Sequence, residues 1–563
     1  MRDLINRLDD SWIERVFLSG WRPFFWLFLA VFIVYAQAFF FNFTYFDDQA
    51  LILENAGYLK NAANIFSAFV QDAFRLVHTS DAYYRPLLTV SLMLDANLGG
   101  VAPFIYHFSN VLLHLAAVWL LFVFFIQLGF RRDQSFFFSL LFAVHPLLTQ
   151  AVVWIPGRND SLLAIGTLAS FIGLLRYLDR RSKPAYLAHL IFFAFALFSK
   201  ESALVIPLLA LGLVYARQKE AFSFRLAGWL IAGWAPIIAG WVVLRNIALV
   251  NPLKLTWLDV LQSLALNFLA VIQLVGKVIF PFNLSVLPTM QDTTPIFGLM
   301  ALVILAALLI PPSDRPAYKW WGIAVFGLFL FPSLIGPNGV TTAGFLEHRM
   351  YLPLIGLLVA LLASDAVGRL RVSRVTALSL GAVLLLLFSA LTFSHSLNFR
   401  DRLTFWESAV STSPHSALAH RNLGAMYQLD GADDKAEQQY LAAIKINRNE
   451  PMAHNNLGLI YMNHKRIAEA ELFFKRELAV NPNYDNALFN LGLLYYQQGL
   501  FGNAETLWKK TIEVNPDYND AYRNLAILYY QAHDFQTAGR YVRVLQQRGL
   551  PVHPALLKTL DSY

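Results

Sequence analysis

The chain has 563 residues, of which 57% are hydrophobic and only 14% are charged, and its mean hydropathy is +0.48. Soluble domains carry roughly 25% charged residues, so this composition excludes an ordinary soluble protein and predicts a protein with many membrane-spanning segments. The formal net charge of +7 does not indicate nucleic-acid binding, because much of the basic excess flanks apolar runs, as positive-inside topology signals do.

Residues 1–20 are predicted to form an amphipathic helix that lies on the cytoplasmic face of the membrane. Its apolar side is formed by Leu4, Ile5, Leu8, Trp12 and Ile13, and its exposed side carries Arg7, Asp9 and Asp10. The apolar run that follows is aromatic-rich and comes after an unusually long charged region. We therefore interpret it as a retained anchor rather than a cleaved signal peptide.

About eleven apolar stretches are long enough, or nearly so, to cross a bilayer. They lie around Trp21–Phe41, Phe104–Leu128, Ser135–Gln150, Ser161–Tyr177, Tyr186–Phe198, Ala203–Tyr215, Phe224–Leu244, Phe297–Ile310, Trp320–Leu334, Tyr351–Ala363 and Val375–Phe393. Two further apolar segments, Leu87–Leu98 and Leu261–Phe280, are predicted to be interfacial or re-entrant. These stretches define a transmembrane domain at 21–397, with a first outer loop at 42–103.

Polar residues gather at the outer ends of these predicted spans. In chain order they are Asp47 and Asp48, Arg85, His145, Arg158 and Asp160, Lys200 and Glu201, Arg245, and the run Glu347, His348, Arg349 and Tyr351. With the N-terminus inside, all of them face the same side. Because charge at the membrane edge is costly, their convergence predicts a polar cavity.

The chemistry that suits such a cavity is transfer from an anionic, lipid-linked donor. Asp48 is predicted to be the base or a metal ligand, with Asp47 as its helper. Cationic side chains would stabilise a departing phosphate, and the candidates are Arg85, Arg158, Lys200 and Arg245. The sequence favours a reaction without a metal, since no second acidic cluster completes an octahedral site, and leaves Mg²⁺ or Mn²⁺ as the alternative.

Structural roles remain open for several of these residues. The aspartates could be solvated at a helix end, Arg158 could pair only with Asp160, and Lys200 with Glu201 could simply close a hairpin. His145 could orient a neighbour or cap a helix, and Arg245 could be an interfacial anchor. His107, Asn110 and His114 share one helical face, where interhelical hydrogen bonding competes with metal ligation.

The C-terminal part, 398–563, repeats the pattern Asn-Leu-(Gly/Ala)-x-x-Tyr. The pattern opens at Asn422, Asn456, Asn490 and Asn524, a constant interval of 34 residues that is typical of the helix-turn-helix tetratricopeptide repeat. Small residues fall where the two helices of a unit must approach closely, at Gly424, Gly458, Gly492 and Ala526. About four units are expected, and the pair Asn447-Arg448 lacks the proline that follows Asn481 and Asn515.

The four asparagines are expected on the concave face of the repeat solenoid. There their amides could hold the backbone of an extended polypeptide, although a structural preference for asparagine at this position of the repeat is the favoured explanation. The predicted fold is therefore all-α, a polytopic membrane bundle followed by an α-solenoid.

The ordered motifs resemble the transmembrane O-mannosyltransferases with tetratricopeptide repeats, a family of the class C glycosyltransferases. The resemblance rests on Phe46-Asp47-Asp48, Tyr84-Arg85-Pro86-Leu87, Tyr106-His107, His145-Pro146, Gly157-Arg158-Asn159-Asp160, Ser199-Lys200-Glu201 and Glu347-His348-Arg349-Met350-Tyr351-Leu352-Pro353, followed by the repeats. It implies a sugar donor on polyprenyl phosphate and a catalytic acid in the first outer loop, which is Asp48, with Asp47. It also adds Arg349 to the phosphate-binding candidates and gives supporting roles to His145, Asp160, Glu201, Glu347, His348 and Tyr351.

The preferred function is transfer of a monosaccharide, mannose in the resembling family, to Ser or Thr hydroxyls of a protein that the repeats bind. The short loops favour a bacterial inner-membrane protein with periplasmic repeats, whereas a eukaryotic chain would place them in the endoplasmic reticulum lumen. Transfer to a lipid or glycan acceptor and a non-enzymatic membrane scaffold remain as alternatives. Membrane lipids are the further expected partners.

Overall fold

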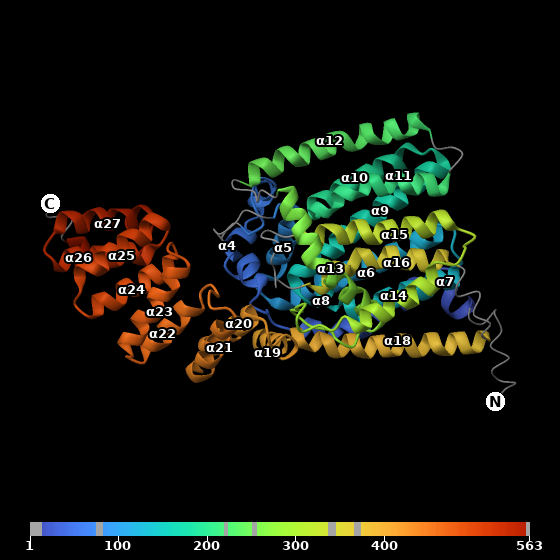
Figure 1. The fold of residues 1–563 in the computed structure, drawn as a ribbon. Helices are drawn as coiled ribbons and strands as arrows, with labels where there is room; N and C mark the ends of the chain where they lie inside the picture. Colours follow the sequence, from blue (N-terminus) through green and yellow to red (C-terminus); the bar gives the residue numbers. More distant parts are fainter. Residues whose placement is uncertain are drawn as a thin grey trace. The chain divides into compact units, whose positions relative to one another are not determined.

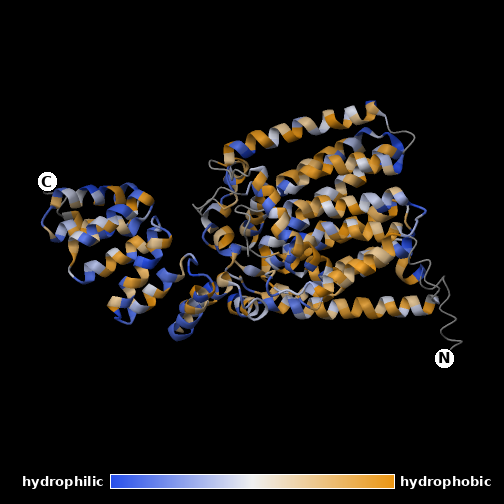
Figure 2. Cartoon of the chain, viewed as in Figure 1, coloured by the Kyte–Doolittle hydropathy of each residue, from blue (hydrophilic) through white to orange (hydrophobic). Residues whose placement is uncertain are grey.

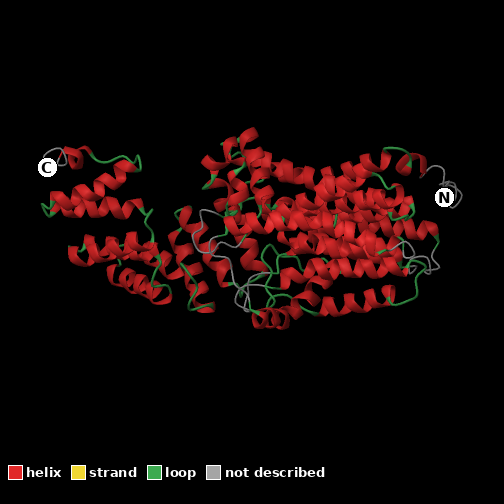
Figure 3. Cartoon of the chain, turned by 90° about the horizontal axis from the view of Figure 1, so that it is seen from above, coloured by secondary structure: helices red, strands yellow, loops and turns green. Residues whose placement is uncertain are grey.

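The computed structural model describes residues 14–74, 83–218, 223–249, 256–335, 345–364 and 373–558. All regular elements within these ranges are helical (Figure 1; Figure 3), so the predicted all-α class is confirmed. The chain divides into two compact units, Met1–Ser413 and Pro414–Tyr563. Most of the amphipathic helix predicted at 1–20 lies outside the described residues.

Seven helices in the described part of the first unit are long and apolar enough to cross a membrane. They are α3 (Arg22–Tyr35, with its extension to Phe40), α6 (Pro103–Gln127), α9 (Arg158–Arg180), α12 (Phe224–Ala248), α13 (Trp257–Ile279), α15 (Pro316–Leu330) and α18 (Arg374–Ser396). Figure 2 shows the apolar residues that run along this bundle. The predicted polytopic membrane bundle is thus confirmed.

Helices of spanning length are fewer than the eleven predicted crossings. The pair α7 (Arg132–Ala143) and Pro146–Val153 is bent by 50° and would add an eighth span if it crosses as one. The remaining apolar helices are shorter: α10 (Lys183–Ser199), α11 (Ile206–Arg217), α14 (Ile296–Leu309) and α16 (Tyr351–Ala363). Several of these end early because polar turns interrupt the apolar run at the end of the bundle that carries the charged residues.

One segment predicted to be interfacial is instead a candidate span. The sequence predicts that Leu261–Phe280 lies at the membrane surface or in a re-entrant loop, whereas the helix found there is long and apolar enough to cross a membrane. The helix α13 begins earlier, at Trp257, behind a capping box formed by Thr256 and Asp259. Its 23 residues extend over about 34 Å, which suffices to cross the hydrocarbon core. By contrast, α5 (Pro86–Gly99) has 14 residues and does not qualify as a span.

Glycines allow neighbouring membrane helices to pack backbone against backbone. A Cβ atom added to Gly322 of α15 would lie 2.5 Å from the carbonyl oxygen of Gly356 in α16, and the reverse distance is 2.6 Å. Gly166 and Gly173 of α9 make the same kind of approach to α10. Such contacts replace the hydrophobic driving force that is missing between helices in lipid. They hold α9, α10, α15 and α16 in a fixed arrangement, from whose ends the polar turns extend.

The first outer loop folds onto α5. Its short helical turns include Gln49–Leu53 and α4 (Ala56–Leu59), and a hydrophobic cluster joins them to α5. The members of this cluster are Phe43, Leu51, Ile52, Leu59, Leu88, Leu92, Met93, Ala96, Tyr106 and Ile155. The loop that carries the two aspartates is therefore anchored to the bundle by buried apolar side chains.

The second unit consists of four antiparallel helix pairs and a short final helix. The pairs are α20 (Ala417–Leu429) with α21 (Asp433–Ile446), α22 (Ala453–Asn463) with α23 (Ile467–Val480), α24 (Asp485–Gln497) with α25 (Phe501–Val514), and α26 (Asn519–Gln531) with α27 (Phe535–Gln547); α28 (Pro554–Lys558) follows. The four helix pairs match the predicted number of repeats, and this unit begins at Pro414. The helix α19 (Arg402–Thr412) lies before the division and belongs to the first unit.

The small residues of the repeat pattern have the predicted packing role. A Cβ atom on Gly424, Gly458 or Gly492 would lie 2.7–2.8 Å from an aromatic ring of the second helix, that of Tyr440, Phe474 or Trp508. In the last pair the ring is replaced by Val542, and alanine takes the glycine position at Ala526. Glycine thus occurs in the first helix where the second helix carries an aromatic ring, because the two helices cannot otherwise approach closely.

The tyrosine of the pattern ties each repeat to the one before it. The hydroxyl of Tyr461 donates to Glu437 at 2.8 Å, and that of Tyr495 donates to Glu471 at 2.9 Å. Tyr529 bonds Glu505 in the same way, so each link joins residues 24 positions apart. This ladder explains why tyrosine recurs at the pattern's last position.

The second repeat departs from the others where the proline is missing. The helix α22 begins at Ala453, and the preceding Met452 adopts a left-handed conformation with φ of 70°. The buried carboxylate of Glu477 accepts hydrogen bonds from the backbone N–H groups of Met452 and Asn455, at 2.9 and 3.2 Å. A glutamate from the next helix therefore caps a helix whose own start signal has been lost.

We predict that Gly492→Ala destabilises the repeats by about 1–3 kcal/mol, because its methyl group would overlap the Trp508 indole. Trp508 cannot move freely, since its Nε1 donates to the carbonyl of Phe489 at 3.1 Å. Thermal unfolding of the full chain in detergent, followed by circular dichroism, measures the change. The matched control is Gly502→Ala in α25, where nothing lies within 4 Å and stability should be equal or slightly higher. Equal melting of both variants would contradict this packing role.

Candidate functional site

The two aspartates of the first outer loop have different environments. Asp48 is only 1% exposed, and its carboxylate accepts hydrogen bonds from the backbone N–H and the hydroxyl of Thr44 at 2.6 and 2.7 Å. The N–H of Phe46 adds a third at 3.3 Å. Asp48 therefore closes the loop from 44 to 48 on itself, and its acceptor positions are occupied by that role.

Asp47 is the more accessible of the two carboxylates. It is half-buried and makes no hydrogen bond or ion pair with any residue that the structure describes. Burial and the adjacent Asp48 raise its pKa to about 7, and Arg85 opposes this rise. A carboxyl group with this pKa exchanges its proton near neutral pH.

Arg85 interacts with this carboxylate and also with basic residues from two other turns, Lys200 and Arg349. Arg85 stands immediately before α5, and its Nε lies 3.3 Å from Glu201 Oε2. Lys200, at the break between α10 and α11, donates from Nζ to Asp160 Oδ1 at 2.6 Å. Each cation thus has a carboxylate beside it, and the Arg85 guanidinium also lies over the Tyr83 ring at 4.4 Å.

A turn before α16 completes the group. Arg349 donates from Nη1 to the Ser333 carbonyl at 2.9 Å, and its charge interacts with those of Arg85 and Asp160. Burial lowers the pKa of His348 well below its usual value, and the charges of Lys200, Arg349 and Arg85 lower it further. We call Asp47, Arg85, Asp160, Lys200, Glu201, His348 and Arg349 the charged cluster, because each interacts electrostatically or by ion pairing with another member.

Two of the arginines predicted to bind phosphate lie outside the charged cluster. Arg158 is buried and pairs with Asp95 at 2.6 Å, and its Nε and Nη2 donate to Asn110 Oδ1 and the Tyr106 carbonyl at 2.8 and 2.9 Å. It therefore pairs with α5 rather than with Asp160, and its donors are already used within the bundle. Arg245, near the end of α12, is half-buried with its guanidinium 5.8 Å from the Trp241 ring.

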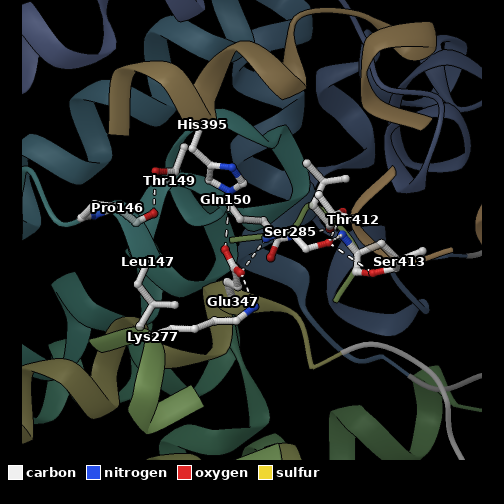
Figure 4. Close-up of polar contacts among 12 residues, drawn as sticks. Pro146, Leu147, Thr149, Gln150, Lys277, Ser285, Glu347, His395, Thr412 and Ser413 are labelled. Carbon is white, nitrogen blue, oxygen red and sulfur yellow. Dashed lines mark hydrogen bonds and ion pairs between the residues drawn. The ribbon is translucent and has the colours of Figure 1, made fainter. Parts of the chain in front are cut away.

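Glu347 belongs to a second, separate network (Figure 4). Its carboxylate is fully buried and accepts from Lys277 Nζ at 2.7 Å and from the Ser285 N–H at 2.9 Å, with His395 Nε2 at 3.5 Å. The Ser285 hydroxyl hydrogen-bonds Thr412 at 2.7 Å, near the end of the first unit. This network joins α13 and α18 to the segment that precedes the repeats.

The remaining predicted residues have packing partners. His145 accepts from the Leu147 N–H at 3.2 Å and its other ring nitrogen lies 3.1 Å from the Val278 carbonyl, so it caps a turn and ties it to α13. The hydroxyl of Tyr351 lies 2.7 Å from His114 Nδ1. Asn110 and His114 thus make interhelical hydrogen bonds, one of the two alternatives that the sequence left open. Among the described residues no group of three or more His, Asp or Glu side chains could hold a metal ion.

Sequence reasoning missed two residues beside the charged cluster. Gln150 is fully buried, and its Oε1 accepts from both the backbone N–H and Nδ1 of His348 at 3.2 Å. Trp154 packs its ring against His348 at 5.4 Å and stacks on Phe46 at 5.5 Å. A buried amide within an apolar run was the signal for Gln150, whereas nothing distinguished Trp154 from the other aromatic residues.

The asparagines of the repeats are not equivalent. Asn490 is buried and donates to Asn455 Oδ1 at 3.0 Å, which links the first helices of two neighbouring repeats. Asn456 accepts from Asn455 at 3.2 Å and Asn422 accepts from Arg421 at 3.3 Å. Asn524 is half-buried and has no hydrogen bond to any described residue.

Comparison with known proteins identifies relatives of both units. Residues 434–486 and 489–549 match the tetratricopeptide repeat family. The Caenorhabditis elegans protein named protein O-mannosyl-transferase F38B6.6 is 25% identical over 424 residues, which are 71% of this chain and 59% of that protein. Protein O-mannosyl-transferase TMTC1 of Mus musculus is 40% identical over 103 residues, 18% of this chain and 11% of its own length. TMTC3 of Homo sapiens is 34% identical over 134 residues, 23% and 14% respectively.

These homologues confirm the resemblance to the O-mannosyltransferases with tetratricopeptide repeats. The chain spans about three fifths of the worm protein and about a tenth to a seventh of these two mammalian proteins. Among solved structures, MamA is 20% identical, with 26% of this chain and 86% of that chain covered and a TM-score of 0.25.

We predict that the Asp47 carboxyl titrates near pH 7 and that Arg85→Gln raises its pKa further, because loss of the nearby positive charge disfavours the carboxylate. Infrared difference spectra of the full chain across this pH range would follow the protonated carboxyl band. Asp47→Asn identifies that band by removing it. Arg245→Gln, which removes an arginine outside the charged cluster, serves as the control and should leave the pKa unchanged. A carboxyl that titrates near pH 4 in the parent protein would refute the assignment.

Proposed function

We propose that the protein is a membrane glycosyltransferase that moves a monosaccharide, mannose, from a polyprenyl-phosphate donor to Ser or Thr hydroxyls of an acceptor protein held by the repeats. The observation that carries the proposal is the charged cluster, in which a carboxylate without a partner among the described residues, with a pKa of about 7, lies beside Arg85. Arg85 in turn interacts with Lys200 and Arg349. The homologues named protein O-mannosyl-transferase support the class of reaction.

The reaction needs one proton acceptor and one anion-stabilising group. As the acceptor oxygen bonds to the anomeric carbon of the sugar, the bond from that carbon to the phosphate oxygen breaks and the phosphate keeps the electron pair. The hydroxyl proton passes to Asp47, which is ionised in a substantial fraction of molecules at neutral pH. Attack from the face opposite to the phosphate inverts the anomeric configuration.

The environments of the two aspartates favour a different division of roles from the one the sequence suggested. Asp48 is committed to Thr44 and Phe46, so we assign it to holding the loop. Asp47 has no such commitment within the described chain and takes the role of base. A loop fixed by Asp48 would hold the neighbouring Asp47 in one position, which lowers the cost of orienting the base.

Three cations are available to the phosphate of the donor. Arg349 is the least neutralised, because its described hydrogen bond is to the carbonyl of Ser333 rather than to a carboxylate. Arg85 and Lys200 each share a carboxylate that a phosphate could partly replace. We assign Glu201 to the orientation of Arg85, and Glu347 to the support of the turn that carries His348 and Arg349.

We further propose that the charged cluster and the repeats face the same extracytoplasmic compartment. This would be the periplasm if the chain belongs to a bacterial inner membrane and the endoplasmic reticulum lumen if it is eukaryotic. The first unit supports this, since its last helix packs beside the first outer loop: Trp406 Nε1 donates to the Thr44 carbonyl at 3.1 Å.

We predict that Asp47→Asn reduces sugar transfer at least a hundredfold without changing the melting temperature, because an amide cannot accept the hydroxyl proton. Asp48→Asn should instead lower stability by about 1–3 kcal/mol, because its amide nitrogen cannot accept the Thr44 or Phe46 hydrogen bonds. Purified full-length protein, radiolabelled prenyl-phosphate mannose and a Ser/Thr-rich peptide provide the assay. Full activity of Asp47→Asn would overturn the proposed mechanism.

We predict that Asn422→Ala and Asn524→Ala each raise the KM for the acceptor about fivefold and leave donor binding unchanged, because a hydrogen bond to the acceptor backbone is worth about 1 kcal/mol. Asn490→Ala is the contrasting variant, since the loss of its bond to Asn455 should lower the stability of the repeats. If the acceptor is a lipid or glycan, neither Asn422→Ala nor Asn524→Ala will change its KM.

A further inference from the structure

The charged cluster contains two buried hydrogen-bond acceptors that face each other. Oδ2 of Asp160 and Nε2 of His348 are 3.9 Å apart, beyond hydrogen-bonding distance, and both side chains are less than 10% exposed. Oδ2 has no hydrogen-bond partner among the described residues, although Oδ1 of the same carboxylate binds Lys200. Buried polar atoms are almost always partnered, so this arrangement points to a ligand.

The tautomer of His348 follows from its neighbours. The amide of Gln150 donates from Nε2 to the Val286 carbonyl at 3.1 Å, which fixes its Oε1 as the acceptor. Nδ1 of His348, 3.2 Å from that Oε1, must therefore carry the proton. The low pKa of His348 is consistent with a neutral ring, so Nε2 presents a lone pair toward Asp160.

Two acceptors opposite each other require two donated protons between them. A single hydroxyl has one proton and would leave the other acceptor unsatisfied. Two hydroxyls on adjacent carbons supply both, with one directed to the carboxylate and the other to the imidazole. Adjacent hydroxyls of this kind are a general feature of monosaccharide rings.

We infer that Asp160 Oδ2 and His348 Nε2 form the sugar-recognition site of the donor, where they accept hydrogen bonds from two adjacent hydroxyls of a hexose. The inference rests on the proposed function and names the residues that would select the sugar. Gln150 acts as a positioning residue, because it sets which nitrogen of His348 is the acceptor.

The surroundings of this site connect it to both reactive groups of the proposed mechanism. Asp160 shares its carboxylate with Lys200, one of the three cations assigned to the phosphate, and the charges of all three cations act on His348. His348 also packs against Trp154, whose ring stacks on Phe46, the residue that precedes Asp47. A sugar held at Asp160 and His348 would thus lie close to the phosphate cations and two ring contacts away from the residue next to the base.

The test measures the affinity of the full chain, in nanodiscs, for prenyl-phosphate mannose, for the same lipid without sugar, and for the 2-, 3-, 4- and 6-deoxy sugar analogues. We expect loss of either of two adjacent hydroxyls to weaken binding about tenfold and loss of the others to have little effect. In His348→Phe, the loss of affinity caused by removing one of these two hydroxyls should disappear. His348→Gln, whose amide oxygen can reach the position of Nε2, should restore that loss of affinity.

The matched control is His189→Phe. His189 is also buried in the bundle, but both of its ring nitrogens are engaged, with Ser170 and with Trp234 Nε1 at 2.8 and 2.9 Å. This variant should keep the parent discrimination among the deoxy sugars, whatever its stability.

The outcomes separate the inference from the proposed function. Suppose that transfer proceeds but no deoxy analogue binds more weakly, or that His348→Phe leaves the weaker binding unchanged. Either result overturns the inference alone and shows that the two acceptors hold water. Discrimination without transfer to any protein overturns the proposed function and keeps the sugar site. Failure to bind any of these lipids overturns both.

Discussion

The high cost of burying charge is the constraint that organises the first unit. At one end of an apolar bundle, three carboxylates and three cations are withdrawn from water, and each must find a partner or move its pKa. The pairs Lys200–Asp160 and Arg85–Glu201 meet this requirement with residues from three separate turns. The same pairs fix how those turns meet, because breaking a buried pair would leave an uncompensated charge.

A second consequence of burying charge is that some polar groups of the first unit have hydrogen-bond partners within the described chain and others have none. Arg158 and Asp48 have their hydrogen-bonding capacity used within the protein, and such residues serve to hold helices and loops in place. Asp47, Asp160 Oδ2 and His348 Nε2 lack partners in the described chain and lie within one cluster. The first group forms a rigid frame, and the second group is what remains free for a substrate. The proposed catalytic and sugar-binding roles both follow from this contrast.

The second unit is stabilised by repetition rather than by charge burial. Each glycine of the pattern admits an aromatic ring from the second helix, and each tyrosine reaches a glutamate in the preceding repeat. Where the pattern loses its proline, Glu477 supplies a cap from the neighbouring helix. A regular solenoid of this kind leaves the first-helix asparagines free to vary in role, from the buried Asn490 to the accessible Asn524.

Local sequence was sufficient for the features that depend on local physics. Apolar runs predicted the membrane bundle, and the 34-residue period predicted four helix pairs with close contacts at Gly424, Gly458 and Gly492, because hydrophobicity and helix packing follow periodicity. The same reasoning did not identify α13 as a candidate span, since a capping box at Thr256 lengthens a run that looks interfacial by composition. It also gave more crossings than there are helices of spanning length among the described residues.

Only the tertiary structure decided which polar residues act together. The sequence alone could not separate Arg158 from Arg85, or Asp47 from Asp48, because each pair of residues has the same chemistry and a similar predicted position. The ion-pair partner of Arg158 is 63 residues away in the sequence, and that of Arg85 is 116 residues away. The distinction between the two arginines therefore depends on long-range contacts. What the chain determined by itself was that charge would collect at the ends of its apolar helices. Which charges are neutralised and which remain available was set by packing, since a hydrogen bond depends on the position of both partners.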